Sequence, residues 1–141
     1  MTLDVVILAA GQGTRMRSKT PKVLHELAGR PLVQHVVDTA AGLESARLHV
    51  VVGHGGKAVR EALSKAGPTP DDRELAFCEQ AEQKGTGHAV AQALDGLGDG
   101  KVLVLYGDVP LIQARTLESL LDGVDEQHMA LLTVTLDDPA G

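Results

Sequence analysis

Short, continuous apolar runs alternate along this chain with segments in which apolar residues recur every three or four positions. Runs rich in β-branched residues that end at glycine or at a polar residue are typical of buried strands in a parallel sheet. Five such runs predict strands at residues 4–10, 48–52, 75–78, 101–106 and 130–136. Helical spacing predicts four helices, which lie after Pro31, near Ala58, after Gly87 and near Leu117.

This alternation of strands and helices predicts the fold class. We expect an α/β domain with a doubly wound, mostly parallel, Rossmann-like sheet of about five strands and helices on both faces. No internal repeat, low-complexity segment or linker divides the sequence. Because ligands of such sheets bind beyond the carboxyl ends of the strands, the residues that follow each strand are the candidates for a site.

Length and composition narrow the class of protein. The chain has 141 residues, of which 43% are hydrophobic and 23% are charged, as in a single folded domain. Its single cysteine, Cys78, excludes a disulfide framework and a multi-cysteine zinc site, and the six histidines lack zinc-site spacing. No apolar run is long enough to span a bilayer and no secretory signal opens the chain, so we expect a cytoplasmic protein without a membrane partner.

The distribution of charge favours a small anionic ligand. The formal net charge is −6, which is the wrong sign for a nucleic-acid binder, and one Phe, one Tyr and no Trp leave little for base stacking. Residues 15–30 nevertheless hold five basic residues against Glu26 alone. One basic segment in an acidic protein is typical of a site for phosphate groups rather than for a polymer.

Polar residues and glycines follow the predicted strands. Gly11 and Gly13 come directly after the first strand, Gln80 and Gly85 after the third, and Asp108 after the fourth. The carboxyl ends of parallel strands meet at one edge of a sheet, so backbone N–H groups, an amide and a carboxylate would gather there.

The first glycine pair matches neither of two common nucleotide-binding motifs. A dinucleotide fingerprint needs a third glycine where this chain has Met16, and an acidic residue at the end of the second strand, where it has Gly53. A phosphate-binding P-loop needs a Lys followed by Ser or Thr that closes a six-residue loop bounded by glycine, and no such loop occurs here. Arg15, Arg17 and the lysines that follow still favour a triphosphate over a pyrophosphate diester.

Three segments together carry a resemblance to a known family. Residues 8–16 with 21–25 read LAAGQGTRM and PKVLH, residues 80–89 read QAEQKGTGHA, and residues 106–111 read YGDVPL. In this order and spacing they resemble the sugar-phosphate nucleotidyltransferases. The His25 continuation is similar to the N-terminal pyrophosphorylase (uridyltransferase) domain of the bifunctional N-acetylglucosamine-1-phosphate uridyltransferase / glucosamine-1-phosphate acetyltransferase group.

The resemblance implies an enzyme and its reaction. It implies Mg²⁺-dependent transfer of a uridylyl group from UTP to N-acetylglucosamine-1-phosphate, which gives UDP-N-acetylglucosamine and pyrophosphate. The product is a precursor of peptidoglycan and lipopolysaccharide in cell wall biogenesis. Because a phosphate monoester has its second pKa at about 6, the attacking phosphate is already anionic and needs no general base.

The resemblance also implies roles for particular residues. The uracil and ribose would contact Leu8, Ala9, Ala10 and Gly11, and the phosphates would contact Gly13, Thr14 and Arg15. Arg15 and Lys22 would act as catalytic cations. Gln80 would read the uracil edge, with the backbone of Gly85 and Thr86 completing the base pocket. Asp108 would hold Mg²⁺, positioned by Tyr106 and Gly107. From its place before Pro110 alone, Asp108 could instead cap a turn.

Two other functions stay open at this point. One is a related nucleotidyltransferase that uses another sugar-1-phosphate, and the other is a noncatalytic nucleotide-binding module. In the family the uridyltransferase domain continues past residue 141, and a β-helix acetyltransferase domain builds a trimer. We therefore expect residues 1–141 to form the nucleotide-binding part of a truncated domain, which binds nucleotide but is incomplete for catalysis.

Overall fold

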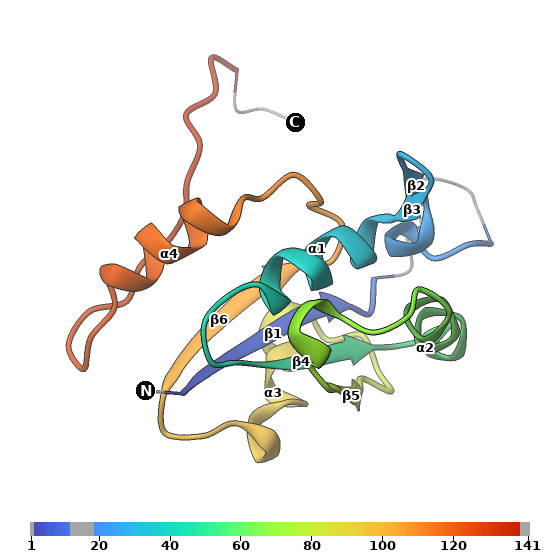
Figure 1. Cartoon of the computed structure of the whole chain (residues 1–141), viewed down its shortest axis with the longest axis horizontal. Coiled ribbons are helices and arrows are strands. Elements are labelled where there is room, and N and C mark those ends of the chain that lie inside the picture. The colour runs from blue at the N-terminus through green and yellow to red at the C-terminus, as the bar shows by residue number, and fades with distance from the viewer. Residues whose placement is uncertain (1, 12–18, 139–141) are drawn as a thin grey trace.

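A parallel sheet of four strands forms the centre of the computed structural model, which describes residues 2–11 and 19–138. The strands are β1 (Leu3–Ala9), β4 (Ala46–Val52), β5 (Leu75–Glu79) and β6 (Lys101–Tyr106), in the spatial order β5-β4-β1-β6. β1 lies in the middle and pairs along its whole length with β4, from Leu3 opposite Ala46 to Ala9 opposite Val52. The four predicted strands before residue 107 are therefore confirmed (Figure 1).

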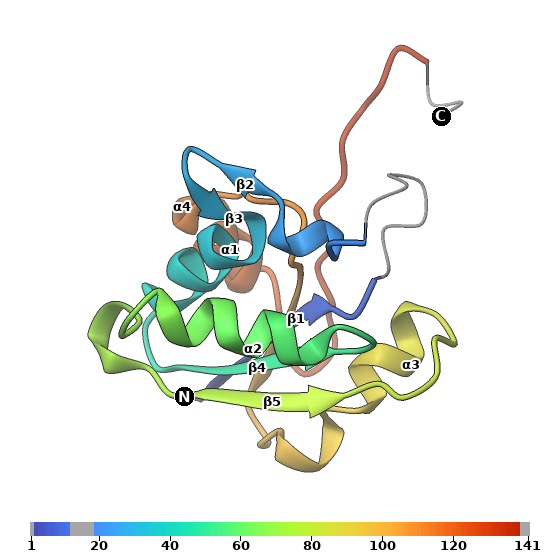
Figure 2. The same cartoon turned by 90° about the vertical axis from the view of Figure 1, so that its right-hand side faces the viewer.

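Helices cover both faces of this sheet, as the alternation of elements predicts (Figures 1 and 2). The long helices are α1 (Leu32–Ala41), α2 (Gly56–Lys65) and α4 (Ala114–Asp122), and the short α3 (Thr86–Ala91) is followed by a 3₁₀ turn. α1, α2 and α4 share one aliphatic core with β1 residues such as Val5 and Ile7. On the opposite face α3 packs against Val6 and Val51. This arrangement is the doubly wound α/β class.

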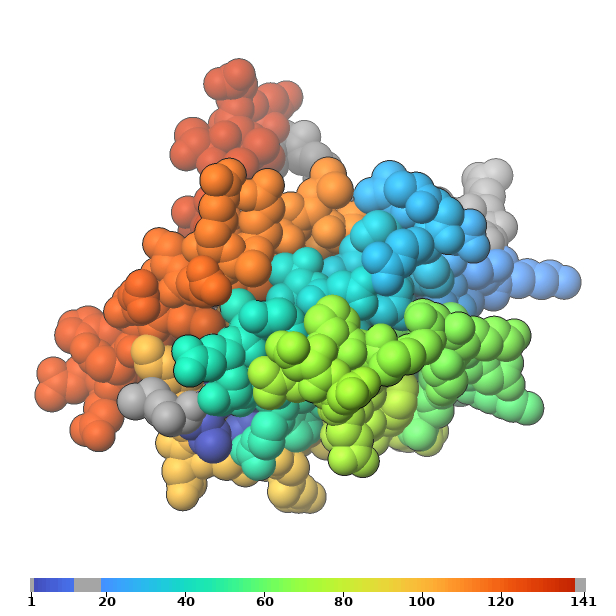
Figure 3. Space-filling view, viewed as in Figure 1, coloured from blue at the N-terminus to red at the C-terminus, as the bar shows by residue number. Residues whose placement is uncertain are grey.

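The expected fifth strand at residues 130–136 is wrong for the described chain. This segment has no strand pairing: its first residues, 130–132, line an apolar cavity with β6, and the chain then projects from the body of the molecule (Figures 1–3). Its alternating apolar residues have the right pattern, but a strand needs a partner for its backbone groups, and none of the described strands pairs with it. Leu131 and Val134 are consequently 75% and 76% exposed.

A small hairpin that the sequence pattern did not predict lies between the first glycine loop and α1. Its strands, β2 (Glu26–Leu27) and β3 (Arg30–Pro31), are antiparallel, and a 3₁₀ helix over Lys22–Leu24 precedes them. Ala28 and Gly29 both adopt positive φ, as the two central residues of a type I′ turn do. The buried Val23 anchors this segment to the core, and this contact fixes the backbone position of the neighbouring Lys22.

A buried charge cluster stabilises the end of the sheet at which the strands begin. Asp4, near the start of β1, is fully buried and accepts hydrogen bonds from Arg47 Nη2 (2.6 Å), His49 Nε2 (2.8 Å) and the backbone N–H of Gly98 (2.9 Å). Burial alone would raise the pKa of Asp4, but these three donors, Arg47 first, hold its pKa below the ordinary value. The cluster ties β1, β4 and the loop before β6 together.

Candidate functional site

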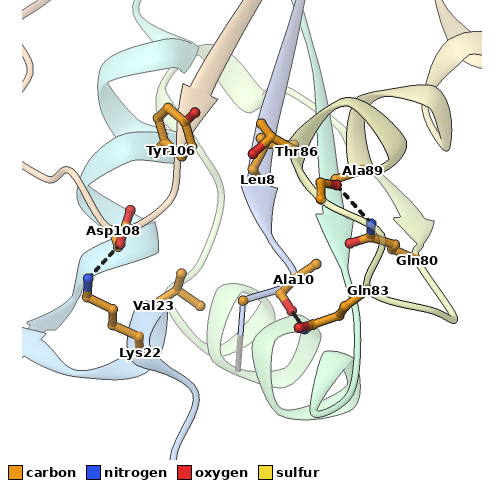
Figure 4. A pocket seen from close by; sticks show the side chains of 12 residues that line it. Leu8, Ala10, Lys22, Val23, Gln80, Gln83, Thr86, Ala89, Tyr106 and Asp108 are labelled. Atoms are coloured by element: carbon orange, nitrogen blue, oxygen red, sulfur yellow. Dashed lines mark hydrogen bonds and ion pairs between the residues drawn. The ribbon is translucent and has the colours of Figure 1, made fainter. Parts of the chain in front are cut away.

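A cavity of about 260 Å³ opens at the carboxyl ends of β1, β5 and β6, the edge at which the sequence predicts a site. Figure 4 shows side chains from all three strand ends facing it. Its walls combine apolar groups with an amide pair, a lysine and a carboxylate. They consist of Leu8, Ala10, Gly11, Lys22, Val23, Gln80, Gln83, Gly85, Thr86, Ala89, Tyr106 and Asp108.

Lys22 and Asp108 face each other across one side of this cavity. Lys22 Nζ lies 2.9 Å from Asp108 Oδ2, and the two side chains are 47% and 29% exposed. Exposed pairs of this kind contribute little to stability because water and salt screen them. The pair therefore matters for what it can bind, since it places one cation and one carboxylate within reach of the same ligand.

Gly107 brings Asp108 to this position. Its N–H donates to the carbonyl of Leu8 (2.9 Å), which extends the β1–β6 ladder by one residue beyond Tyr106. A Cβ at this position would lie 2.9 Å from that same carbonyl oxygen and 3.2 Å from Val23 Cγ1. Only glycine allows the chain to approach β1 closely enough here, so Gly107 serves the site through the backbone.

Replacing Gly107 with alanine is expected to lower the free energy of unfolding by about 1–2 kcal/mol, because the added methyl group overpacks this contact. Chemical denaturation of the variant and the wild type measures the difference. Gly42→Ala is a matched control, since its Cβ would find ordinary contacts of 3.5 Å or more at a helical φ of −74°. A loss in Gly107→Ala no larger than in the control would contradict the close approach.

Gln80 supplies a buried amide on the other side of the cavity. Its backbone N–H donates to the carbonyl of Val52 (2.7 Å), which continues the β4–β5 ladder past Glu79. The residue is only 3% exposed. Its side-chain Nε2 lies 3.3 Å from the carbonyl oxygen of Gly85 and 2.9 Å from His88 Nδ1. The amide is therefore rigidly held at the cavity wall.

Most of the residues expected to contact substrate line this cavity, and a few do not. Ala9 is buried in the core with its side chain away from the cavity, and Gly107 acts behind the wall. Gly13, Thr14 and Arg15 lie outside the described residues, as does Arg17. The expected roles of all these residues remain predictions.

Three lining residues were missed by sequence reasoning. Val23 and Ala89 have apolar side chains that gave no chemical signal. Gln83 lies inside the recognised segment 80–89, and its Nε2 donates to the carbonyl oxygen of Ala10 (2.5 Å). This bond ties the loop after β5 to the end of β1, so Gln83 closes the base of the cavity (Figure 4). Its place beside Gln80 in that segment is the one signal that could have indicated it.

The described residues fit a magnesium ion only in part. Asp108 is the one carboxylate among the residues that line the cavity, and no cluster of three His, Cys, Asp or Glu side chains occurs within 2–11 and 19–138. Mg²⁺ usually keeps several waters and takes one or two carboxylates together with substrate phosphates. A single partly exposed carboxylate beside a lysine fits this mode of binding, in which substrate phosphates complete the coordination. It does not fit a closed site made of protein ligands alone.

None of the helices in the described part of the chain has the length and hydropathy that a bilayer crossing requires.

Comparison with known proteins identifies the family. A relative from Chromohalobacter salexigens, named "Bifunctional protein GlmU", is 68% identical over all 141 residues, and the chain spans 30% of that relative's length. A nucleotidyl transferase from Methanothermobacter thermautotroptrophicus matches 88% of this chain and 58% of its own, with a TM-score of 0.70 and 23% identity. A UDP-glucose pyrophosphorylase complexed with UDP-glucose matches 86% and 54%, with a TM-score of 0.68 and 22% identity.

These two structures share the fold of this chain. The family of MobA-like NTP transferase domains matches residues 5–140, which include all four strands of the sheet apart from the first two residues of β1. The matched range also includes every residue of the cavity wall. The chain therefore belongs to the MobA-like NTP transferase domain family.

Proposed function

We propose that this chain forms the nucleotide-binding part of a domain that transfers a uridylyl group from UTP to N-acetylglucosamine-1-phosphate. The observation that carries the proposal is the meeting of a buried amide, a lysine and a carboxylate in one cavity at the carboxyl edge of the sheet. The Gln80 amide on one wall could read the base of a nucleotide, and the Lys22–Asp108 pair on the opposite wall could bind its phosphates. The high identity to a "Bifunctional protein GlmU" and the motifs of the uridyltransferase group support uracil and this sugar phosphate.

The base and ribose would occupy the wall formed by β1, β5 and the start of α3. Leu8 and Ala89 offer apolar contact, while Gln80 and the backbone of Gly85 offer polar groups at the base edge. A volume of about 260 Å³ is below the roughly 300–1,000 Å³ typical of pockets for whole ligands. The described cavity therefore matches the nucleoside and its first phosphate better than the complete triphosphate.

The phosphates would lie toward Lys22 and Asp108. Lys22 would exchange its partner Asp108 for phosphate oxygens and neutralise charge near the reacting phosphorus. Arg15, Gly13 and Thr14 are proposed phosphate contacts that precede it in the chain. Asp108, released from Lys22, would hold Mg²⁺, which when bound supplies charge neutralisation across phosphate oxygens.

The reaction needs positioning and charge stabilisation more than proton transfer. An oxygen of the sugar phosphate would attack the α-phosphorus of UTP, the bond from that phosphorus to the β-phosphate oxygen would break, and pyrophosphate would leave with the bonding electrons. Because the attacking oxygen is already anionic, no residue must remove a proton. Lys22 and Arg15 would stabilise the negative charge that develops on the leaving group.

Calorimetric titration of the 141-residue chain with UTP and with NADH, each with and without Mg²⁺, tests the proposal. We expect UTP to bind with an affinity that Mg²⁺ improves. We expect NADH to bind at least about tenfold more weakly, because a dinucleotide carries no triphosphate for the proposed cations Lys22 and Arg15. Equal or tighter binding of NADH, or no binding of UTP, would contradict the proposed function.

A further inference from the structure

The side-chain amide of Gln80 is held in a single orientation by its neighbours. The carbonyl oxygen of Gly85 can only accept a hydrogen bond, so the amide atom 3.3 Å from it must be the nitrogen. The same Nε2 lies 2.9 Å from His88 Nδ1, which accepts the second N–H when the ring carries its proton on Nε2. Both protons of the amide nitrogen are thus directed away from the cavity.

The amide oxygen is left as the group that faces the ligand. Figure 4 shows the oxygen of Gln80 on the cavity side and the nitrogen turned toward the loop that leads into α3. Among the described residues no donor is found for this oxygen, although the residue is only 3% exposed. The oxygen is not among the buried side-chain atoms that lack a partner, so it is open to the cavity, where the N–H of a ligand can donate to it.

His88 is held in place from a second side. It lies in the first turn of α3 and is only partly exposed, and it does not line the cavity itself. Gln92 Nε2 donates to the His88 carbonyl (3.0 Å), and its amide approaches the other ring nitrogen at 3.4 Å. With the ring proton on Nε2, the 3.4 Å contact sets two donors against each other and is no hydrogen bond, so the bond from Gln92 to the His88 carbonyl is what holds this turn of α3.

We propose that His88 is a positioning residue that keeps the Gln80 oxygen turned to the base, so that the site selects uracil over cytosine. The inference rests on the proposed function and specifies how the base is read. Uracil presents an N3–H donor to an acceptor, whereas cytosine presents a lone pair at the same atom. With the His88 proton on Nε2, rotating the amide to suit cytosine would place its oxygen against two acceptors, Gly85 O and His88 Nδ1, which opposes the rotation.

Three variants of the 141-residue chain separate the contributions. His88→Leu removes the acceptor at similar bulk, His88→Asn keeps an acceptor near the position of Nδ1, and Gln80→Leu removes the reading amide. The measurement is the ratio of the dissociation constants for CTP and UTP in Mg²⁺, by calorimetry. This ratio cancels effects on the phosphates, which the two nucleotides share. Thermal melting of each variant verifies folding.

We expect the wild type to prefer UTP by about 10- to 100-fold, the range that one well-formed base contact gives. His88→Leu is expected to reduce this preference about five- to tenfold, chiefly by tightening CTP, because the amide can then rotate. His88→Asn should retain most of the preference. Gln80→Leu should abolish it and weaken UTP binding.

The outcomes distinguish this inference from the function on which it rests. Failure of the wild type to bind UTP would overturn the proposed function. Binding of UTP with a preference that Gln80→Leu removes and His88→Leu leaves unchanged would overturn the role of His88 alone. A His88→Asn variant as unselective as His88→Leu would also overturn it, because a lost acceptor could not then explain the effect. If one His88 variant fails to fold, the CTP-to-UTP ratio of the other is compared with the ratios of the wild type and of Gln80→Leu.

Discussion

Replacing Asp108 with asparagine is expected to abolish the effect of Mg²⁺ on UTP binding without weakening the binding of metal-free UTP. In the wild type the carboxylate both holds Lys22 and would hold the ion. Without it, Lys22 is free to meet the phosphates and one negative charge is removed, so UTP binding in EDTA stays equal or becomes tighter. The gain on adding Mg²⁺ falls from about tenfold to less than about twofold, the loss of one charge-assisted contact.

Where transfer can be measured, for example as exchange of labelled pyrophosphate into UTP, the same variant is expected to lose about 10²- to 10³-fold in rate. Asp95→Asn is the matched control, because Asp95 is an exposed aspartate that does not line the cavity. An Asp108→Asn variant that keeps the full Mg²⁺ gain would remove the metal role from this carboxylate. A variant that loses UTP binding even in EDTA would point instead to a structural role.

The second large effect is expected at the other end of β1. Asp4→Asn should lower the free energy of unfolding by about 3 kcal/mol, because two of the three donors around the buried carboxylate carry or can carry positive charge. At this chain length the melting temperature should fall by about 10 °C. Urea denaturation of the variant beside an exposed control, Asp99→Asn, measures the difference. UTP affinity should not change, since the cluster lies at the opposite end of the strands from the cavity.

The pH dependence of stability provides an independent measure of Asp4. Its pKa is lowered in the folded protein from an ordinary value of 3.8, so its contribution is fully present above about pH 3.8. The contribution is lost as the pH falls through the lower, folded-state pKa. The wild type should therefore lose stability on acidification below pH 3.8 more steeply than Asp4→Asn. Parallel acid transitions of the two proteins would contradict a buried, charge-paired Asp4.

The central sheet could be predicted because each of its strands is a nearly continuous apolar run. Val5, Val6 and Ile7 are all completely buried, which requires cover on both faces and hence helices on both sides. The burial of the charged Asp4 could not be predicted from the sequence, because its partners Arg47 and His49 are more than 40 positions away. The identity of a buried charge's partners is tertiary information that local pattern does not contain.

Two local predictions failed or fell short for related reasons. Residues 130–136 have strand propensity, but a strand exists only where a neighbour completes its hydrogen bonds, and this segment does not pair with β6, an open edge of the described sheet. The β2–β3 hairpin, in contrast, turns on Ala28 and Gly29, and alanine at positive φ is not a sequence signal for a turn. In both cases pairing, rather than propensity, decided the structure.

The position of the site could be predicted because parallel topology brings separate loops to one edge. Leu8, Gln80 and Asp108 lie far apart in the sequence, yet they line one cavity because they end neighbouring or nearby strands. The Lys22–Asp108 pair and the orientation of the Gln80 amide could not be predicted in the same way. They depend on the 3₁₀ helix at Lys22–Leu24 and on where α3 begins, and these follow from packing.

Tyr106 gives this cavity a spectroscopic consequence. It is the one tyrosine of a chain that has no tryptophan, and its ring lies half-exposed at the cavity wall. Because tyrosine emits more strongly than the single phenylalanine, intrinsic ultraviolet emission from the protein originates mainly beside this cavity. Apart from Phe77, which packs against the aliphatic core, no other Phe, Tyr or Trp contributes, so a change in emission reports on the place where the chemistry is proposed to occur.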